Sequence, residues 1–397
     1  MGKFRLAVFN TQPPHLYFGG VERRIIETTK RLTSQADVTV YSGTKAGFNT
    51  QTTINGVNFV PCHSTDKAFP VDNWFFNRSL TQQASGIRAN VYEAHLSSGY
   101  GLLKALKEQG SSKPFIHTVH GVLADEYEQA KRNGYTSLRS RVANQLMRRL
   151  ARLEEKTAKN ATLVVTISKY SLEKMQHHYN VDKAKVRIVP NGVDPEKFKP
   201  VNNKAIVKQQ FGLGDKSVVL FVGSLILRKG LPFLVEAAKT IAKQKTDTQF
   251  VVVGDGPLRN QLISRLEAFG LADKFTFLNW LSEDELAAAY NCADVFVLPS
   301  IQEGQGIVLL EAQASATPVV AFNIGGVNEA VVNGETGLLV NRDSSGELAD
   351  ALLRLLLDKA LREKMGTAGR RFVVENFTWA ICAERMLAVY REALNQQ

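Results

Sequence analysis

Short apolar runs, many of them β-branched, alternate with stretches of helical periodicity along the whole chain. Nearly continuous apolar strands separated by helices are typical of parallel sheets that helices cover on both faces. The pattern therefore predicts two doubly wound α/β domains. We expect strands at 4–10, 37–42, 57–62, 90–96, 114–120, 163–168 and 186–190, and then at 217–224, 249–255, 275–280, 294–300, 318–323 and 337–340.

A segment without periodicity, 191–203, separates the two sets of strands. It contains two prolines, three asparagines and charges of both signs, which is typical of a linker. We therefore place the boundary between a first domain, 1–195, and a second domain, 196–376. An amphipathic helix is expected at 379–395, after a break in the pattern.

Composition narrows the class of protein. A chain of 397 residues with 44% apolar and 22% charged residues is typical of a globular protein with room for two domains. It contains no apolar run of about 18 residues, so we expect no membrane-spanning helix. Its three cysteines are widely separated. This spacing predicts neither a disulfide framework nor a zinc site, and it favours a cytoplasmic protein.

The net charge of +11 is unevenly distributed. Residues 1–200 contain 29 Lys and Arg against 16 Asp and Glu, whereas residues 201–397 contain 20 against 22. A basic half points to nucleic acid, an anionic membrane surface or an anionic substrate as its partner.

Two glutamates lie eight positions apart in EGQGIVLLEA, 303–312. Glu303 follows an expected strand, and Glu311 lies on the helix that begins after Gly306. Amide N–H groups at a helix N-terminus suit a phosphate, and carboxylates accept hydrogen bonds from hydroxyl groups. A sugar, a diphosphate and a ribose in a row would satisfy both, and together they make a nucleotide sugar. The alternative is that Glu303 is a loop charge and Glu311 a solvated helix residue.

A second turn between a strand and a helix, GSLILRKG (223–230), contains Arg228 and Lys229. Arginine can bind two phosphate oxygens at once, and lysine adds a compact charge. An exposed basic turn without a ligand is the alternative.

Taken together, several segments resemble glycosyltransferase family 4, and the resemblance extends over essentially the whole chain. It implies the GT-B fold of two facing Rossmann-like domains, with a final helix, within 377–397, that returns to the first domain. It also implies transfer of a sugar with retention of anomeric configuration. The segments are VPNGVDPEKF (189–198), VGSLILRKG (222–230), VVVGDGPLRNQL (251–262), FLNWLSEDELAAAYNCADVFVLPSIQEGQGIVLLEA (277–312), TPVVAFNIGGVNEAV (317–331) and NGETGLLV (333–340).

The resemblance also implies roles in the second domain, which would bind the donor. Glu303 would lie by the donor sugar and Glu311 by the ribose, while Arg228 and Lys229 would hold the diphosphate. The remaining donor-binding positions would act through the backbone: Gly223, Leu281, Gly306, Ile307 and Val308.

Two positions depart from the family's pattern. Many members have arginine where this chain has Ser224, and Arg228 beside Lys229 would replace it, as in lipopolysaccharide glucosyltransferases with a similar GSxxxRKG. Gln305 stands where an aromatic residue is frequent, which leaves the donor sugar open.

In the first domain, which would bind the acceptor, YFGGVERRIIE (17–27) resembles the family's glycine-rich loop facing the diphosphate. Gly19 and Gly20 would allow the backbone to approach closely. Glu22 is interpreted as a helix cap rather than a catalytic group.

Three histidines are candidates for the reacting centre. His120 matches the family histidine near that centre, whereas His117 and His95 are weaker candidates. A buried structural histidine is the alternative for each of them.

The resemblance implies chemistry without a metal ion. The acceptor hydroxyl would attack on the leaving group's own face, and the leaving diphosphate would take its proton. The chain contains no Asp-x-Asp motif, so we expect no metal site, no cofactor and no need for a divalent metal. The expected catalytic residues are His120, Glu303, Arg228 and Lys229.

The acceptor is expected to be lipid-linked or a saccharide, because family members commonly act on lipid-linked acceptors; a small soluble acceptor is the alternative. The segment 130–160 could form a basic amphipathic helix on an anionic membrane. An apolar stripe buried in the core would explain the same pattern. Aromatic residues in a loop-like stretch, 69–80, could add to the contact. We therefore expect a cytoplasmic protein that can be peripheral on the inner face of the membrane.

Other classes of protein explain the residues less well. A NAD-dependent oxidoreductase would need GxGxxG after its first strand, where this chain has FGGVER. A non-catalytic binder of nucleic acid or another polyanion fits the basic half but leaves Glu303, Glu311, Arg228 and Lys229 unexplained, so we expect no nucleic-acid partner. A phosphorylase of similar fold would need a lysine-bound pyridoxal phosphate.

Overall fold

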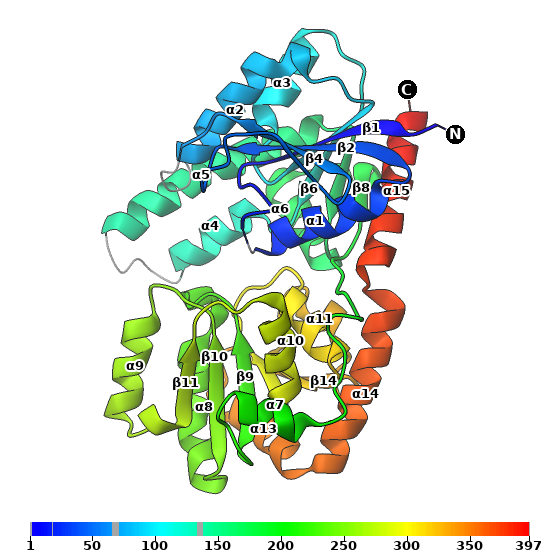
Figure 1. Ribbon diagram of the computed structural model, residues 1–397. Coiled ribbons are helices and arrows are strands. Elements are labelled where there is room, and N and C mark those ends of the chain that lie inside the picture. Colours follow the sequence, from blue (N-terminus) through cyan, green and yellow to red (C-terminus); the bar gives the residue numbers. More distant parts are fainter. Residues whose placement is uncertain (1, 18, 66–70, 133–137, 397) are drawn as a thin grey trace. The chain divides into compact units, whose positions relative to one another are not determined.

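The computed structural model describes residues 2–17, 19–65, 71–132 and 138–396, with only the backbone described for 138–140 (Figure 1). The chain divides into two compact units. The first consists of Met1–Asn191 together with Trp379–Gln397, and the second is Gly192–Thr378.

The first unit is built on one sheet with the strand order β3-β4-β2-β1-β5-β6-β7-β8. All neighbouring strands are parallel except β3, which runs antiparallel to β4. Chain order reverses between β1 and β5, where ligands collect in open α/β sheets. The strands are β1 Phe4–Asn10, β2 Ala36–Gly43, β3 Thr52–Ile54, β4 Val57–Cys62, β5 Val91–His95, β6 Phe115–Val119, β7 Leu163–Thr166 and β8 Val186–Ile188.

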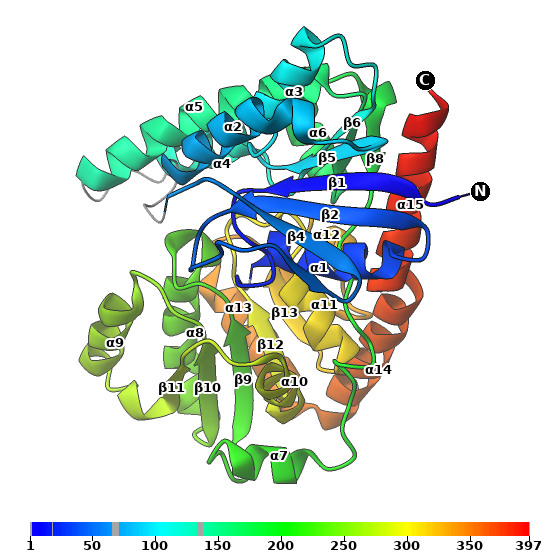
Figure 2. The ribbon, with the colours of Figure 1, turned by 45° about the horizontal axis from the view of Figure 1, so that its top comes forward.

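Helices cover both faces of this sheet (Figure 2). Helices α2, α3 and α5 lie on one face, where Phe76, Leu80 and Leu102 pack with Phe9 of β1. On the other face α15 packs against α1, although the two are far apart in the sequence. The helices are α1 Gly20–Leu32, α2 Val71–Gln83, α3 Tyr100–Glu108, α4 Leu123–Arg132, α5 Leu138–Asn160, α6 Lys169–Tyr179 and α15 Trp379–Asn395.

The second unit contains a fully parallel sheet with the strand order β11-β10-β9-β12-β13-β14. Its chain order reverses between β9 and β12. The strands are β9 Ser217–Val222, β10 Thr248–Val253, β11 Phe275–Leu278, β12 Val295–Leu298, β13 Val319–Phe322 and β14 Gly337–Val340. The helices are α7 Lys204–Gln210, α8 Leu231–Gln244, α9 Arg259–Ala268, α10 Glu283–Cys292, α11 Ile307–Ala314, α12 Val327–Ala330, α13 Ser345–Leu357 and α14 Lys359–Asn376.

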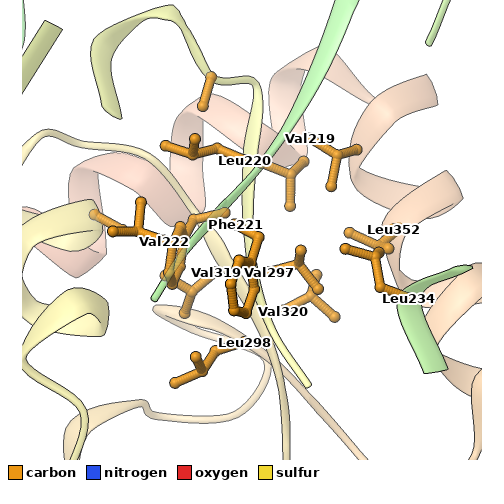
Figure 3. Packing of buried hydrophobic residues seen from close by; sticks show 14 of the residues in the cluster. Val219, Leu220, Phe221, Val222, Leu234, Val297, Leu298, Val319, Val320 and Leu352 are labelled. Carbon is orange, nitrogen blue, oxygen red and sulfur yellow. The ribbon is translucent and has the colours of Figure 1, made fainter. Parts of the chain in front are cut away.

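Both faces of the central strands of this second sheet are buried, as their unbroken apolar sequences predict. Val219, Val297 and Val320 belong to one cluster with Leu234 of α8 and Leu352 of α13 (Figure 3). Each of these side chains is at most 1% exposed. A core of this kind holds the carboxyl ends of β9 and β12 in fixed register.

Three details differ from the sequence prediction. The short strand β3 was not expected, because its residues Thr52–Ile54 are partly or fully exposed and too few to show a pattern. The stretch expected to be loop-like, 69–80, is helical from Val71 onward, and residues 69 and 70 lie outside the described residues. The first unit ends at Asn191 rather than at residue 195, and it resumes at Trp379 rather than at residue 377.

The earlier boundary has a physical cause in the hydrogen bonds of the linker. Val193 N–H donates to the carbonyl of Phe377 (2.8 Å), and Arg370 of α14 donates to the carbonyls of Pro195 (3.3 Å) and Phe198 (3.1 Å). The linker residues after Asn191 are therefore held on the second unit.

Candidate active site

In the second unit, the turn after β9 contacts the turn after β12. Gly230 has a φ of 69°, and a Cβ atom added there would lie 1.7 Å from the carbonyl oxygen of Pro299. Ile301 N–H donates to the carbonyl of Arg228 (2.8 Å). Only glycine permits this approach, which places Arg228 and Lys229 beside the segment that carries Glu303.

Lys229 and Glu303 form an ion pair across these two turns. Lys229 Nζ lies 2.6 Å from Glu303 Oε2, and the side chains are 13% and 12% exposed. Ser300 Oγ lies 3.4 Å from the same oxygen. Burial acts to raise the pKa of Glu303, but the charges of Lys229 and Arg228 and the hydrogen bonds outweigh it and lower the pKa. Glu303 is therefore a carboxylate held between cations, and not a solvated loop charge.

Helix α11 begins next to this pair. Its N-cap is Gly306, which has a φ of 89° and supplies no side-chain cap. The first-turn amides, including those of Ile307 and Val308, thus point out of the helix with the positive end of its dipole. Gln305, where an aromatic residue is frequent in the family, is buried at 2% exposure.

Glu311 lies on α11, and its side chain is 2% exposed, so it is not a solvated helix residue. Its Oε2 accepts a hydrogen bond from the hydroxyl of Tyr290 (2.7 Å) on α10. The sequence analysis missed Tyr290, because in AAAYNC it reads as an apolar position of an amphipathic helix.

The carboxyl ends of β10 and β11 lie close to that of β9. Gly254 has a φ of 127°, and a Cβ there would lie 2.2 Å from the carbonyl oxygen of Gly223. Beside them, Leu281 packs partly buried on the core, whereas the neighbouring Trp280 is 55% exposed. The expected backbone site at Gly223 and Leu281 therefore has an exposed aromatic ring next to it.

In the first unit, Gly19 is the N-cap of α1 and Gly20 is its first residue. A Cβ at Gly19 would lie 2.1 Å from Glu22 Oε2, so the glycine leaves room for that carboxylate at the helix N-terminus. Glu22 also accepts from Asn10 Nδ2 (3.2 Å) and is 7% exposed. This placement fits a helix cap, as expected for Glu22. Phe18 of the same motif lies outside the described residues.

The three histidines are not equivalent. His95 at the end of β5 and His120 after β6 lie together, with Nδ1 of His95 2.9 Å from Nε2 of His120. His117 points into the core with no exposed surface, and burial lowers its pKa to about 3. The structure thus pairs His120 with His95 and buries His117 completely.

Across the described residues, no three His, Cys, Asp or Glu side chains are grouped so as to hold a metal ion. In the same parts of the chain, no helix is both long and apolar enough to cross a bilayer.

Known proteins match the chain on both sides of the linker. Residues 18–197 match the family model "Glycosyltransferase Family 4", and residues 203–372 match "Glycosyl transferases group 1". The D-inositol 3-phosphate glycosyltransferase of Corynebacterium glutamicum is 32% identical over 290 residues, which cover 71% of this chain and 67% of that protein. The chain belongs to glycosyltransferase family 4. It is therefore a glycosyltransferase, as its motifs predicted.

A second relative in the family is the GDP-mannose-dependent alpha-(1-6)-phosphatidylinositol monomannoside mannosyltransferase of Mycobacterium tuberculosis. It is 34% identical over 254 residues, which cover 62% of this chain and 64% of that protein. The matches to curated relatives span about half to two thirds of those proteins' own lengths.

Among solved structures, the sucrose-phosphate synthase of Thermosynechococcus elongatus superposes with a TM-score of 0.86 over the whole of both chains, at 23% identity. At this identity the likeness concerns the fold alone. Together with the two doubly wound sheets, it confirms the predicted GT-B fold.

Proposed function

We propose that the protein transfers a hexose from a nucleoside-diphosphate sugar to a lipid-linked or saccharide acceptor, with retention of anomeric configuration. The observation that carries the proposal is the Lys229–Glu303 ion pair, which lies beside Arg228 and the uncapped N-terminus of α11. Cations and outward-pointing amides suit a diphosphate, and a carboxylate among them suits the hydroxyls of the attached sugar.

In the proposed mechanism the second unit binds the donor and the first unit binds the acceptor. Arg228, Lys229 and the first-turn amides of α11 stabilise the charge that grows on the leaving diphosphate. Glu311 accepts hydrogen bonds from the ribose, and Glu303 from the donor sugar. The acceptor hydroxyl attacks on the face of the leaving group, and the diphosphate takes its proton.

An anionic acceptor fits the charge of the first unit. The relatives named above act, by their names, on D-inositol 3-phosphate and on a phosphatidylinositol mannoside. Both acceptors carry phosphate, which the surplus of positive charge in residues 1–200 would attract.

Helix α5 supports contact with an anionic surface. Its apolar stripe is partly core, since Leu150 packs with Leu123 of α4. Its outer face exposes Val142 and a set of arginines, and Trp74 of α2 is 56% exposed. The side chains of Leu138 and Arg139, expected in the same pattern, lie outside the described residues. We propose electrostatic association rather than deep insertion. The exposed arginines are Arg141, Arg148, Arg149 and Arg152.

Thermal-shift screening of UDP-, GDP- and ADP-sugars should identify a stabilising donor, and a transfer assay with that donor tests the reaction. We propose that no divalent metal is required, because Arg228 and Lys229 supply the charge. Full activity in EDTA is therefore expected. Strict and reversible dependence on Mg²⁺ or Mn²⁺, or an inverted product, would overturn the mechanism.

A further inference from the structure

A chain of polar contacts lies behind His120 in the first unit. His120 Nε2 lies 2.9 Å from Nδ1 of His95, and Nε2 of His95 lies 3.4 Å from Oε1 of Glu93. Glu93 accepts O–H hydrogen bonds from Thr118 (2.6 Å) and from Tyr390 of α15. Glu93, His95 and Tyr390 are 3%, 2% and 1% exposed. Strands β5 and β6, helix α15 and the turn after β6 therefore contribute to one chain of polar contacts that ends at His120.

The contacts at Glu93 favour one arrangement of the protons on the two rings. A carboxylate only accepts hydrogen bonds, so it favours N–H over a lone pair on the facing Nε2 of His95. A neutral imidazole has one N–H, so Nδ1 of His95 is an acceptor. The proton in the 2.9 Å contact then belongs to Nε2 of His120. The lone pair of the His120 ring is left on Nδ1.

Both rings are neutral near pH 7. Burial lowers the pKa of His95 to about 4, with Glu93 opposing this effect and Arg24 adding to it. Burial also lowers the pKa of His120 well below its usual value, with smaller effects from His95, Arg24 and His117. The titratable and charged groups that act on the pair are Arg24 of α1, Glu93 of β5 and His117 of β6. Cys382 and Tyr390 of α15 lie beside Glu93 and Arg24.

Tyr390 is the last member of this chain of polar contacts. Burial, and then the charge of Glu93, raise the pKa of the Tyr390 phenol, so it keeps its proton and donates. Its hydroxyl and that of Thr118 bind different oxygens of Glu93 and fix the plane of the carboxylate.

We propose that Glu93 and His95 are positioning residues that hold His120 as a neutral ring with Nδ1 as a hydrogen-bond acceptor. The inference rests on the proposed function, in which His120 lies at the reacting centre. Among the described residues, His120 Nδ1 has no hydrogen-bond partner, and His120 as a residue is partly exposed. An uncharged acceptor suits a hydroxyl group, of the donor sugar or of the acceptor, and does not suit a phosphate oxygen.

Nitrogen NMR of the full-length protein labelled with ¹⁵N-histidine tests the proton positions directly. The His120 signals are assigned by their loss in His120→Gln. We expect an N–H signal for Nε2 and a lone-pair signal for Nδ1 near neutral pH. In Glu93→Gln the new amide donates to His95 Nε2, so the His95 proton moves to Nδ1. His95 then donates to His120 Nε2, and the His120 proton moves to Nδ1. The opposite assignment in the wild type, or no change in Glu93→Gln, would overturn the proposal.

Kinetics test whether this arrangement matters for transfer. Glu93→Gln should lower kcat on the order of tenfold with little change in donor KM, and Tyr390→Phe should lower it less. Glu154→Gln and Tyr179→Phe are matched controls, because they alter another buried tyrosine–glutamate pair of the same unit (2.6 Å). Equal kcat in Glu93→Gln and these controls would overturn the positioning role. The NMR experiment needs no substrate, so a wild type without turnover would count against the proposed function alone.

Discussion

Lys229 and Glu303 place opposite charges 2.6 Å apart where β9 and β12 end, with little exposure to solvent. If either side chain moved away, the charge of the other would remain buried without a partner. In the proposed function a bound diphosphate would add negative charge beside Lys229, and this charge would increase as the bond to the sugar breaks.

Lys229→Ala is therefore expected to lower kcat more than it raises donor KM. The loss of transition-state stabilisation should be about 2–4 kcal/mol, as for the removal of one preorganised donor. Steady-state kinetics measure the two effects. Lys239→Ala is a matched control, since it breaks a more exposed pair with Glu236, in which the lysine is 41% exposed. Similar kinetics in both variants would contradict the role of Lys229.

Glu311→Gln is expected to weaken donor binding by about 1–3 kcal/mol, the range for a hydrogen bond to a charged group. Tyr290→Phe should weaken it less, because the carboxylate remains and loses only the hydroxyl that orients it (2.7 Å). Calorimetric titration with the nucleoside diphosphate alone measures both effects. An affinity of Glu311→Gln equal to that of the wild type would show that Glu311 does not bind the ribose.

Glu154 predicts a pH effect on the stability of the first unit. It is fully buried, and burial raises its pKa to about 8, partly opposed by hydrogen bonds from Tyr179 and Leu123. The folded state therefore keeps the Glu154 proton at pH values above 4.5, the ordinary pKa of the group, where the unfolded state has released it. The stability that protonated Glu154 contributes is fully present at low pH. It falls by about 1.4 kcal/mol for each unit of pH as the pH rises toward 8.

Glu154→Gln should remove this loss, because glutamine resembles the protonated acid. Hydrogen exchange of the α5 and α6 amides should match the wild type near pH 5 and be slower than the wild type near pH 8. Faster exchange of the variant at both pH values would show that Glu154 is ionised in the folded state.

At the scale of elements, the candidate site in the second unit contains two turns packed backbone to backbone. Gly230→Ala would place a methyl group 1.7 Å from the Pro299 carbonyl oxygen, so we expect it to push the two turns apart. Gly270→Ala is a matched control, because its φ is 64° and nothing lies within 4 Å of the added Cβ. The control should cost about 1–2 kcal/mol in stability and leave donor binding unchanged.

Gly230→Ala should cost more than the control and should also abolish donor binding, since Lys229 and Glu303 would no longer meet. Thermal unfolding with and without the nucleoside diphosphate separates the two effects. Retained ligand stabilisation in Gly230→Ala would mean that the contact between the turns is not needed for the site.

At the scale of the whole molecule, the last helix belongs to the first unit, although the second unit comes between them in the sequence. Met386 and Tyr390 are buried, and Arg24 of α1 lies 3.4 Å from Met386 Sδ. Arg24 also donates to Val189 O (2.9 Å) and Asn191 Oδ1 (3.0 Å). Arg24 thus contacts both the end of the first segment of this unit and the helix with which the chain returns to it.

Deleting residues 379–397 is expected to destabilise the first unit and to leave the second nearly unchanged. The deletion exposes the face of α1 and leaves Glu93 without Tyr390. Hydrogen exchange should increase in β1 and α1 but not in β9 and α8. Equal increases in both sheets would mean that α15 stabilises the second unit as well.

The sequence by itself determined the parallel strands of the two sheets, the linker and the places of the turns at 223–230 and 303–306. Each of these follows from a local pattern: apolar strands buried on both faces, helical periodicity, and a glycine turn between a strand and a helix. The strand at 4–10 and the start of α11 after Gly306 were predicted correctly for this reason. The exact end of the first unit was not, because hydrogen bonds of Arg370 hold the linker.

Only the tertiary structure decided which side chains meet. Glu311 and Tyr290 are 21 positions apart, His95 and His120 are 25 apart, and Glu93 and Tyr390 are 297 apart. The reason is that strand order and helix packing bring these pairs together, while sequence spacing carries no record of either. The candidate glutamates and histidines could be named from the sequence, but their contacts with Tyr290, Tyr390 and Glu93 appear only in the fold.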